Sequence, residues 1–148
     1  MPVCTTDILL EGVRRDTVFE WLSAPENHSL ILDGAFDRVD NVGAGSWDLS
    51  LTLLGRTRRL EYRFGRPDDS HGGRRILIET GGKRFRGKLN YSLRTMKPST
   101  NTLVTVTMDY DPGSVLGAVL SSAGLNETLE RHWSRVLENL SRTIPRER

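Results

Sequence analysis

Polar and apolar residues alternate in six consecutive segments of the chain, and turn residues separate these segments. The segments span residues 36–42, 46–54, 57–64, 74–80, 83–95 and 102–110. In the last one every second residue is apolar: Val104, Val106, Met108 and Tyr110. A period of two indicates strands with one covered face and one solvent face. The short connections between the segments favour antiparallel hairpins.

The N-terminal part adds one strand and two short helices. Residues 5–11 read as a strand with Ile8 and Leu10 on one side. Asp16 is expected to cap a short helix that ends at Pro25, and a second short helix or turn is expected over residues 25–31. We expect the first strand to pair with the last, because the sheet would otherwise end in an unpaired edge.

A long one-sided helix is predicted near the C-terminus. Apolar residues recur there mostly three or four positions apart: Val115, Leu116, Val119, Leu120, Leu125, Leu129, Trp133, Val136, Leu137, Leu140 and Ile144. Such a stripe must lie against another apolar surface. The predicted fold is therefore α+β, a helix-grip in which a seven-stranded curved antiparallel sheet wraps around the C-terminal helix. Residues 1–148 are expected to form a single domain.

Composition and charge narrow the partners that can be expected. The chain has 18 Arg and only 3 Lys, with a net charge of +2, and the basic residues are dispersed. The dispersion favours a solvated sheet face and argues against a nucleic-acid partner. No apolar stretch approaches the roughly 20 residues of a membrane span. The single Cys4 and the absence of a visible secretory signal favour a reducing, cytoplasmic location.

Several local motifs resemble those of START-like and polyketide-cyclase-like domains, the superfamily that includes the birch-pollen-allergen fold. They are residues 18–22 with 24–28, 43–47, 110–113 with 116–117, and 137–140. The resemblance extends over about residues 5–144. It implies a cavity between the sheet and the C-terminal helix. Members of this superfamily bind sterols, lipids, quinones, hormones or polyketide intermediates, and a minority are cyclases or dehydratases.

The aromatic residues of the covered sheet face are the main candidates for a ligand-binding lining. With their neighbours, the expected lining residues are Trp47, Tyr62, Phe64, Ile78, Tyr91 and Met108 from the sheet and Leu116, Gly117 and Leu120 from the helix. Tyrosine hydroxyls would orient a ligand in an otherwise apolar space. The alternative is a packed core without a cavity. Gly117 and Gly124 indicate either room for a ligand or a break in the helix.

Residues for catalysis or metal binding form no recognisable motif. His28, His71 and His132 do not have the spacing of a zinc site, and we expect neither a metal nor a cofactor. His132 is a weak catalytic candidate at the pocket wall, or else a hydrogen-bonded residue at the edge of the core. His28 is expected in a loop at the pocket edge. Asp109 should face solvent, and Asp111 should serve in a turn or cap.

Three functions agree with these patterns. The first is binding of a small hydrophobic molecule, such as a lipid, a quinone or a polyketide-like compound, by a protein that is not an enzyme. The second is a polyketide cyclase or dehydratase, with His132 or a pocket tyrosine as proton donor. The third is a protein-interaction or chaperone-cofactor module. Each of them leaves a homodimer open.

Overall fold

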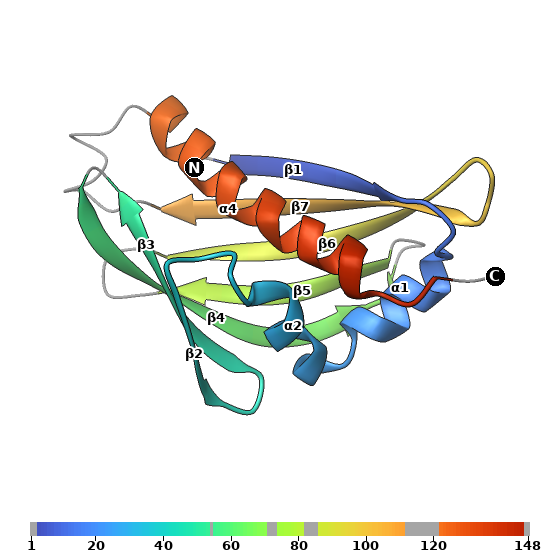
Figure 1. Cartoon of the computed structure of the whole chain (residues 1–148), viewed down its shortest axis with the longest axis horizontal. Coiled ribbons are helices and arrows are strands. Elements are labelled where there is room, and N and C mark those ends of the chain that lie inside the picture. The colour runs from blue at the N-terminus through green and yellow to red at the C-terminus, as the bar shows by residue number, and fades with distance from the viewer. Residues whose placement is uncertain (1–2, 54, 71–73, 82–85, 112–121, 147–148) are drawn as a thin grey trace.

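The computed structural model describes residues 3–53, 55–70, 74–81, 86–111 and 122–146. It confirms the predicted helix-grip (Figure 1). The elements are β1 (Val3–Leu10), α1 (Arg15–Leu22), the 3-10 helix η1 (Pro25–Asn27), α2 (His28–Leu32), β2 (Arg38–Gly43), β3 (Ser46–Leu53), β4 (Arg56–Asp68), β5 (Arg74–Gly81), β6 (Arg86–Met96), β7 (Asn101–Asp111) and α4 (Ser122–Thr143).

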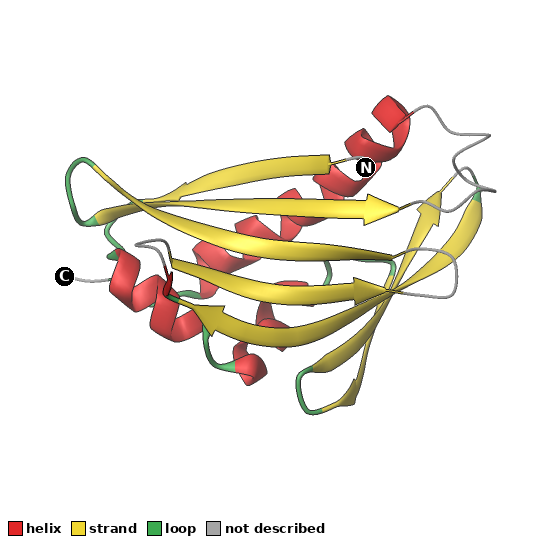
Figure 2. Cartoon of the chain, turned by 180° about the vertical axis from the view of Figure 1, so that it is seen from behind, coloured by secondary structure: helices red, strands yellow, loops and turns green. Residues whose placement is uncertain are grey.

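The strands form one antiparallel sheet in the order β1-β7-β6-β5-β4-β3-β2. The predicted pairing of the first and last strands is confirmed, with Cys4 opposite Met108. All helices lie on one face of the sheet, and the opposite face carries none of the described elements (Figure 2). The sheet is curved, and α4 crosses its covered face diagonally.

The helix α4 buries the apolar side that its spacing predicted. Its buried residues are Leu125, Leu129, Trp133, Val136, Leu137 and Leu140, and Ile144 follows directly after it. The helix continues through Gly124, so no break occurs at that residue. Positions 115–120 of the predicted stripe lie outside the described residues.

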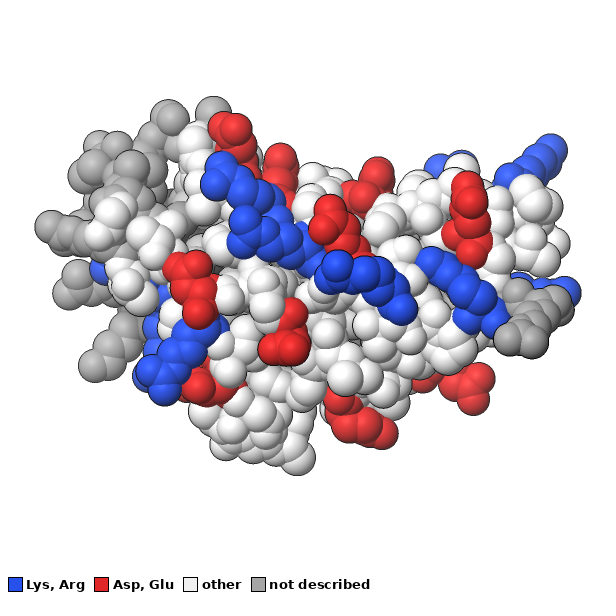
Figure 3. All heavy atoms as spheres, in the orientation of Figure 1, with Lys and Arg blue, Asp and Glu red and all other residues white. Residues whose placement is uncertain are grey.

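The alternation of the strands also predicted their faces correctly. Leu60 and Tyr62 of β4 are buried, whereas Arg59 on the other face is exposed. Arg59 and Arg63 both pair with Asp48 of the neighbouring β3, at 3.0 and 3.4 Å. On the face that carries the helices, basic side chains along α4 are interspersed with acidic ones (Figure 3). Acidic and basic side chains are thus mixed on this solvent-exposed surface of the described part.

Two local expectations are corrected. The helix α1 begins at Arg15, and its N-cap residue is Arg14, whose side chain makes no capping hydrogen bond. Asp16 lies inside the first turn, where a carboxylate is favoured by the helix dipole, and it pairs with Arg74 of β5. The strand β4 continues past its predicted end at Phe64, because a bulge there accommodates Gly65. A Cβ atom on Gly65 would lie 2.5 Å from the carbonyl oxygen of Leu77.

Candidate functional site

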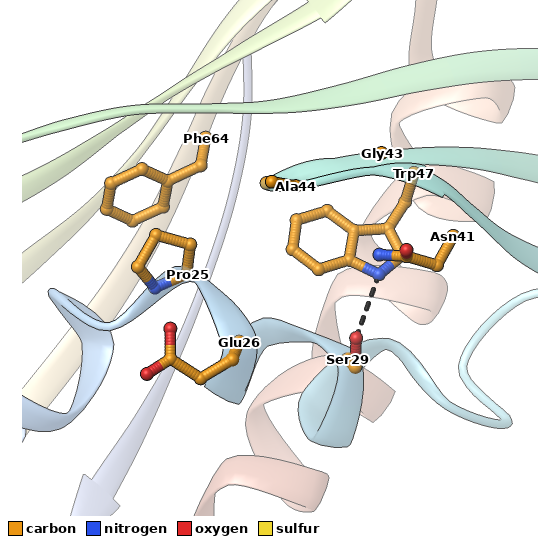
Figure 4. Close-up of a pocket in the computed structure, with 9 residues that line it drawn as sticks. Pro25, Glu26, Ser29, Asn41, Gly43, Ala44, Trp47 and Phe64 are labelled. Atoms are coloured by element: carbon orange, nitrogen blue, oxygen red, sulfur yellow. Dashed lines mark hydrogen bonds between the residues drawn. The ribbon is translucent and has the colours of Figure 1, made fainter.

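A cavity of about 510 Å³ lies between the β2–β3 hairpin and the segment formed by η1 and α2 (Figure 4). We call it the hairpin pocket. Its lining residues are Pro25, Glu26, Ser29, Asn41, Gly43, Ala44, Gly45, Trp47 and Phe64. A second hollow of about 350 Å³ shares Ser29, Asn41 and Trp47 with it and adds Leu30, Asp33, Val39 and Thr143.

The tight hairpin turn and one hydrogen bond hold the walls of the pocket. Gly45 has a φ of +69°, a conformation that favours glycine, and a Cβ atom on it would lie 3.3 Å from Cβ of Phe64. The indole Nε1 of Trp47 donates to Oγ of Ser29 at 3.0 Å, which ties β3 to α2. The rings of Phe64 and Trp47 stand on opposite sides of the space (Figure 4).

Behind the pocket, three side chains form a buried chain of hydrogen bonds, which we call the Tyr–Tyr–His chain. The hydroxyls of Tyr91 and Tyr62 are 2.7 Å apart, and that of Tyr62 is 2.7 Å from Nδ1 of His28. Nε2 of His28 lies 2.8 Å from the carbonyl oxygen of Leu22. Because a carbonyl only accepts, Nε2 carries the proton. In the neutral ring Nδ1 then accepts from Tyr62, which accepts from Tyr91.

Burial sets the protonation of this chain. It lowers the pKa of His28 to about 4, although the hydrogen bond to Leu22 and the charge of Glu26 act in the opposite direction. Burial also raises the pKa of both tyrosines, so their hydroxyls remain protonated at neutral pH. A neutral imidazole and two neutral phenols therefore satisfy one another inside the protein.

Aromatic rings surround His28 and connect it to the pocket. The ring centroids of Phe64 and Trp47 lie 5.2 and 6.2 Å from that of His28. Those of Tyr62 and Tyr91 lie 5.8 and 5.9 Å away. Phe64 and Trp47 thus lie between the pocket and the Tyr–Tyr–His chain. They line the pocket on one side and pack against His28 on the other.

The predicted lining residues fall into three groups. Trp47 and Phe64 line the hairpin pocket. Tyr62 and Tyr91 lie behind it, and their hydroxyls bond within the chain. Ile78 and Met108 are buried in the core. The helix residues Leu116, Gly117 and Leu120 lie outside the described residues, so that end of the predicted lining stays a prediction.

Trp133 of α4 occupies the space over part of the sheet. Its indole Nε1 donates to the sulfur of Met108 at 3.3 Å, and its ring centroid is 6.2 Å from that of Tyr62. Its ring also packs edge-on against Phe36 at 5.2 Å. The bulky half of α4 therefore packs directly on the sheet at this level.

His28 is the residue that sequence reasoning placed wrongly. It was expected as a loop residue at the pocket edge, whereas it begins the short helix expected over residues 25–31 and is fully buried. A signal was present, because Ile31 and Leu32 follow at the three- and four-residue spacing of one helix face, and both are buried. The pocket residues Glu26 and Asn41 had no such signal, since they come from separate segments.

His132, the weak catalytic candidate, is buried and hydrogen-bonded at the edge of the core. Its Nδ1 lies 2.8 Å from the carbonyl oxygen of Ala35, to which it donates. Its ring stacks on Phe36 with centroids 4.9 Å apart and planes 5° from parallel. Asp109 is exposed as expected, and His71 lies outside the described residues. These contacts hold His132 of α4 against the segment that contains Ala35 and Phe36.

Three further findings concern the described residues. They contain no group of three His, Cys, Asp or Glu side chains that could hold a metal ion. None of their helices combines the length and the apolar character that crossing a bilayer requires. Cys4 is buried, and burial raises the pKa of its thiol to about 12, so the thiolate is disfavoured at neutral pH.

Comparisons with known proteins reveal similarity in structure but not in sequence. No protein-family model matches the chain, and no curated protein is detectably similar to it in sequence. A conserved protein from Geobacillus kaustophilus superposes with a TM-score of 0.64 at 15% identity, covering 96% of this chain and 94% of that one. Ara h 8.0201 superposes with a TM-score of 0.58 at 10% identity, covering 96% and 97%.

An enzyme is among the similar structures. A point mutant of norcoclaurine synthase from Thalictrum flavum, in complex with a transition state analogue, superposes with a TM-score of 0.54. The identity is 14%, and the match covers 93% of this chain and 95% of that one. Likeness at such low identity shows the fold alone. The strand order, the covering helices and these superpositions together show that the chain has the START-like and polyketide-cyclase-like fold, the fold of the birch-pollen allergens.

Proposed function

We propose that the protein binds a small, mainly apolar molecule, such as a lipid, a quinone or a polyketide-like compound. The observation that carries this proposal is the hairpin pocket, where the aromatic walls of Trp47 and Phe64 face one space with a few polar groups at its edge. Apolar walls with few polar groups are typical of small-molecule sites. We propose that the site continues into a cavity between the sheet and the C-terminal helix, bordered by Gly117, as the resemblance to START-like domains implies.

The fold itself supports a binding role. The norcoclaurine synthase that superposes on this chain holds a small molecule in its structure. The cytoplasmic location and a homodimer belong to the same proposal, and they rest on the sequence alone.

Titration with the neutral dye Nile red tests the proposal. The native protein should bind the dye at a defined stoichiometry. Ala44→Phe should weaken binding at least about tenfold, because Ala44 is exposed in the hairpin turn and its new ring would enter the pocket. Val42→Phe is the matched control, since Val42 is 54% exposed on the same hairpin and lines neither hollow. Equal binding by all three proteins would place the dye elsewhere and refute the assignment.

The Tyr–Tyr–His chain supports a second candidate, a cyclase or dehydratase acting on a polyketide-type substrate. A phenol that stays protonated at neutral pH can donate a hydrogen bond to the negative charge that develops on a substrate carbonyl oxygen, and Tyr91 is the end of this chain that His28 does not occupy. Turnover of a poly-β-keto thioester by the native protein, lost in Tyr91→Phe while Nile red still binds, would support this candidate. Absence of turnover in the native protein would leave the binding role.

A further inference from the structure

We infer that the hairpin pocket takes an organic cation, a primary amine or quaternary ammonium group on an apolar body, with its charge facing Glu26. This inference rests on the proposed function and specifies the class of ligand. It is carried by the charge of the lining residues and by the two aromatic rings that face across the space.

The charges around the pocket have one sign. Glu26 is the ionisable residue of the hairpin pocket, and Asp33 is that of the adjoining hollow. Among the described residues no Arg or Lys lines either space, although the chain contains 21 of them and has a net charge of +2. The ion pairs of the described residues involve neither carboxylate. A ligand there meets negative charge that none of the described basic side chains neutralises by an ion pair.

The field of Glu26 reaches the back wall of the pocket. Burial lowers the pKa of His28, and the charge of Glu26 opposes that shift. The direction of this effect on His28 agrees with the place of Glu26 in the pocket lining, because a carboxylate favours positive charge near it. A cation placed in the pocket would therefore be attracted by this carboxylate, whereas a carboxylate or phosphate ligand would be repelled.

The aromatic walls favour the same charge. The faces of Trp and Phe rings attract a cation that lies within about 6 Å of the ring centroid. Figure 4 shows the rings of Trp47 and Phe64 on opposite sides of the space, and Glu26 of η1 lies next to Pro25 at the edge of the pocket. Asn41 contributes a side-chain carbonyl that can accept from an ammonium N–H. Phe64, the carboxylate and the amide thus favour the same type of head group, and Trp47, which is 1% exposed, forms the closed wall behind it.

Two probes of nearly the same shape isolate the effect of charge. Benzyltrimethylammonium carries a quaternary nitrogen, and neopentylbenzene has carbon in the same position. Competition with bound Nile red should give at least about tenfold tighter binding of the cation at low ionic strength, and the difference should shrink as salt is added. Phenylacetate should bind more weakly than either probe.

Two variants test whether the preference for the cationic probe depends on the carboxylate of Glu26. Glu26→Gln should remove most of the tenfold preference and leave the affinity for neopentylbenzene unchanged. Glu20→Gln is the matched control, because Glu20 is exposed on α1 and lines neither hollow. Both residues are exposed, so folding should be retained.

The outcomes separate this inference from the proposed function. If Nile red binds in the pocket but both neutral and cationic probes compete equally, or neither competes, the cation assignment is wrong and the binding function stands. If Glu20→Gln lowers the preference as much as Glu26→Gln, the effect comes from general surface charge and the assignment is also wrong. If Nile red itself fails to bind at a defined site, the proposed function fails.

Discussion

The hydroxyl oxygen of Tyr62 lies 2.7 Å from Nδ1 of His28, a residue 34 positions earlier in the chain. This contact joins the middle strand of the β3–β4–β5 region to α2 inside an otherwise apolar interior. Both groups are buried, so neither can exchange its partner for water. The position of α2, and with it one wall of the hairpin pocket, therefore depends on this hydrogen bond.

Removing the middle hydroxyl of the chain should destabilise the protein more than removing the last one. Tyr62→Phe leaves both Nδ1 of His28 and the hydroxyl of Tyr91 without their partner, which should cost about 1–3 kcal/mol. Tyr91→Phe removes one donor, and the bond between Tyr62 and His28 persists, so about 0.5–1.5 kcal/mol is expected. Urea denaturation of both variants measures the difference. The reverse order of stabilities would contradict the hydrogen bonding proposed for the Tyr–Tyr–His chain.

The stability of the protein should fall in acid because of His28. Its pKa is about 4 in the folded protein against an ordinary value of 6.5, so between these values the unfolded state binds more protons. The contribution of neutral His28 to the free energy of unfolding is complete above about pH 6.5. It is lost progressively as the pH falls to about 4, and it does not change below pH 4. The loss should be on the order of 3 kcal/mol.

His28→Gln is the variant that isolates this effect. The free energy of unfolding is measured by urea denaturation for both proteins across this pH range. The carboxylates titrate alike in the two proteins, so the advantage of the native protein over the variant should shrink towards pH 4. Parallel profiles would mean that His28 is not held neutral by burial.

Two buried threonines should respond to the same substitution with opposite signs. Oγ1 of Thr80 is buried and has no hydrogen-bond partner among the described residues, so Thr80→Val should stabilise the protein by about 1 kcal/mol. Oγ1 of Thr102 donates to the carbonyl oxygen of Val13 at 2.7 Å, so Thr102→Val should destabilise it by about 1–3 kcal/mol. Shifts in thermal midpoint check both signs, and destabilisation by Thr80→Val would show that its hydroxyl has a partner.

Arg63 should contribute more than its neighbour on the same strand. Its guanidinium donates to the carbonyl oxygen of Trp47 at 2.9 Å and also pairs with Asp48, so Arg63→Gln should cost about 1–2 kcal/mol. The side chain of Arg59 is 66% exposed and has the ion pair with Asp48, so Arg59→Gln should change stability by less than about 1 kcal/mol. Equal effects in chemical denaturation would mean that the bond to Trp47 contributes nothing.

The spacing of apolar residues within each strand or helix was sufficient to predict which face of that element is buried. Leu60 and Tyr62 could be assigned to the core because strand alternation is local, and Leu129 and Trp133 because helix spacing is local. The pairing of β1 with β7 followed from the need to close an edge. The cap at Asp16 was predicted wrongly, because its carboxylate pairs with Arg74, which is distant in the chain.

The sequence alone thus determined the order of elements, their buried faces and the helix-grip. Only the tertiary structure decided the site. Glu26, Asn41 and Phe64 come from η1, β2 and β4, and the curvature of the sheet brings them around one space. The burial of His28 likewise depended on Tyr62, whose hydroxyl supplies the hydrogen bond that an interior imidazole needs. Periodicity reports which side of an element is covered, but it carries no information about which distant side chain covers it.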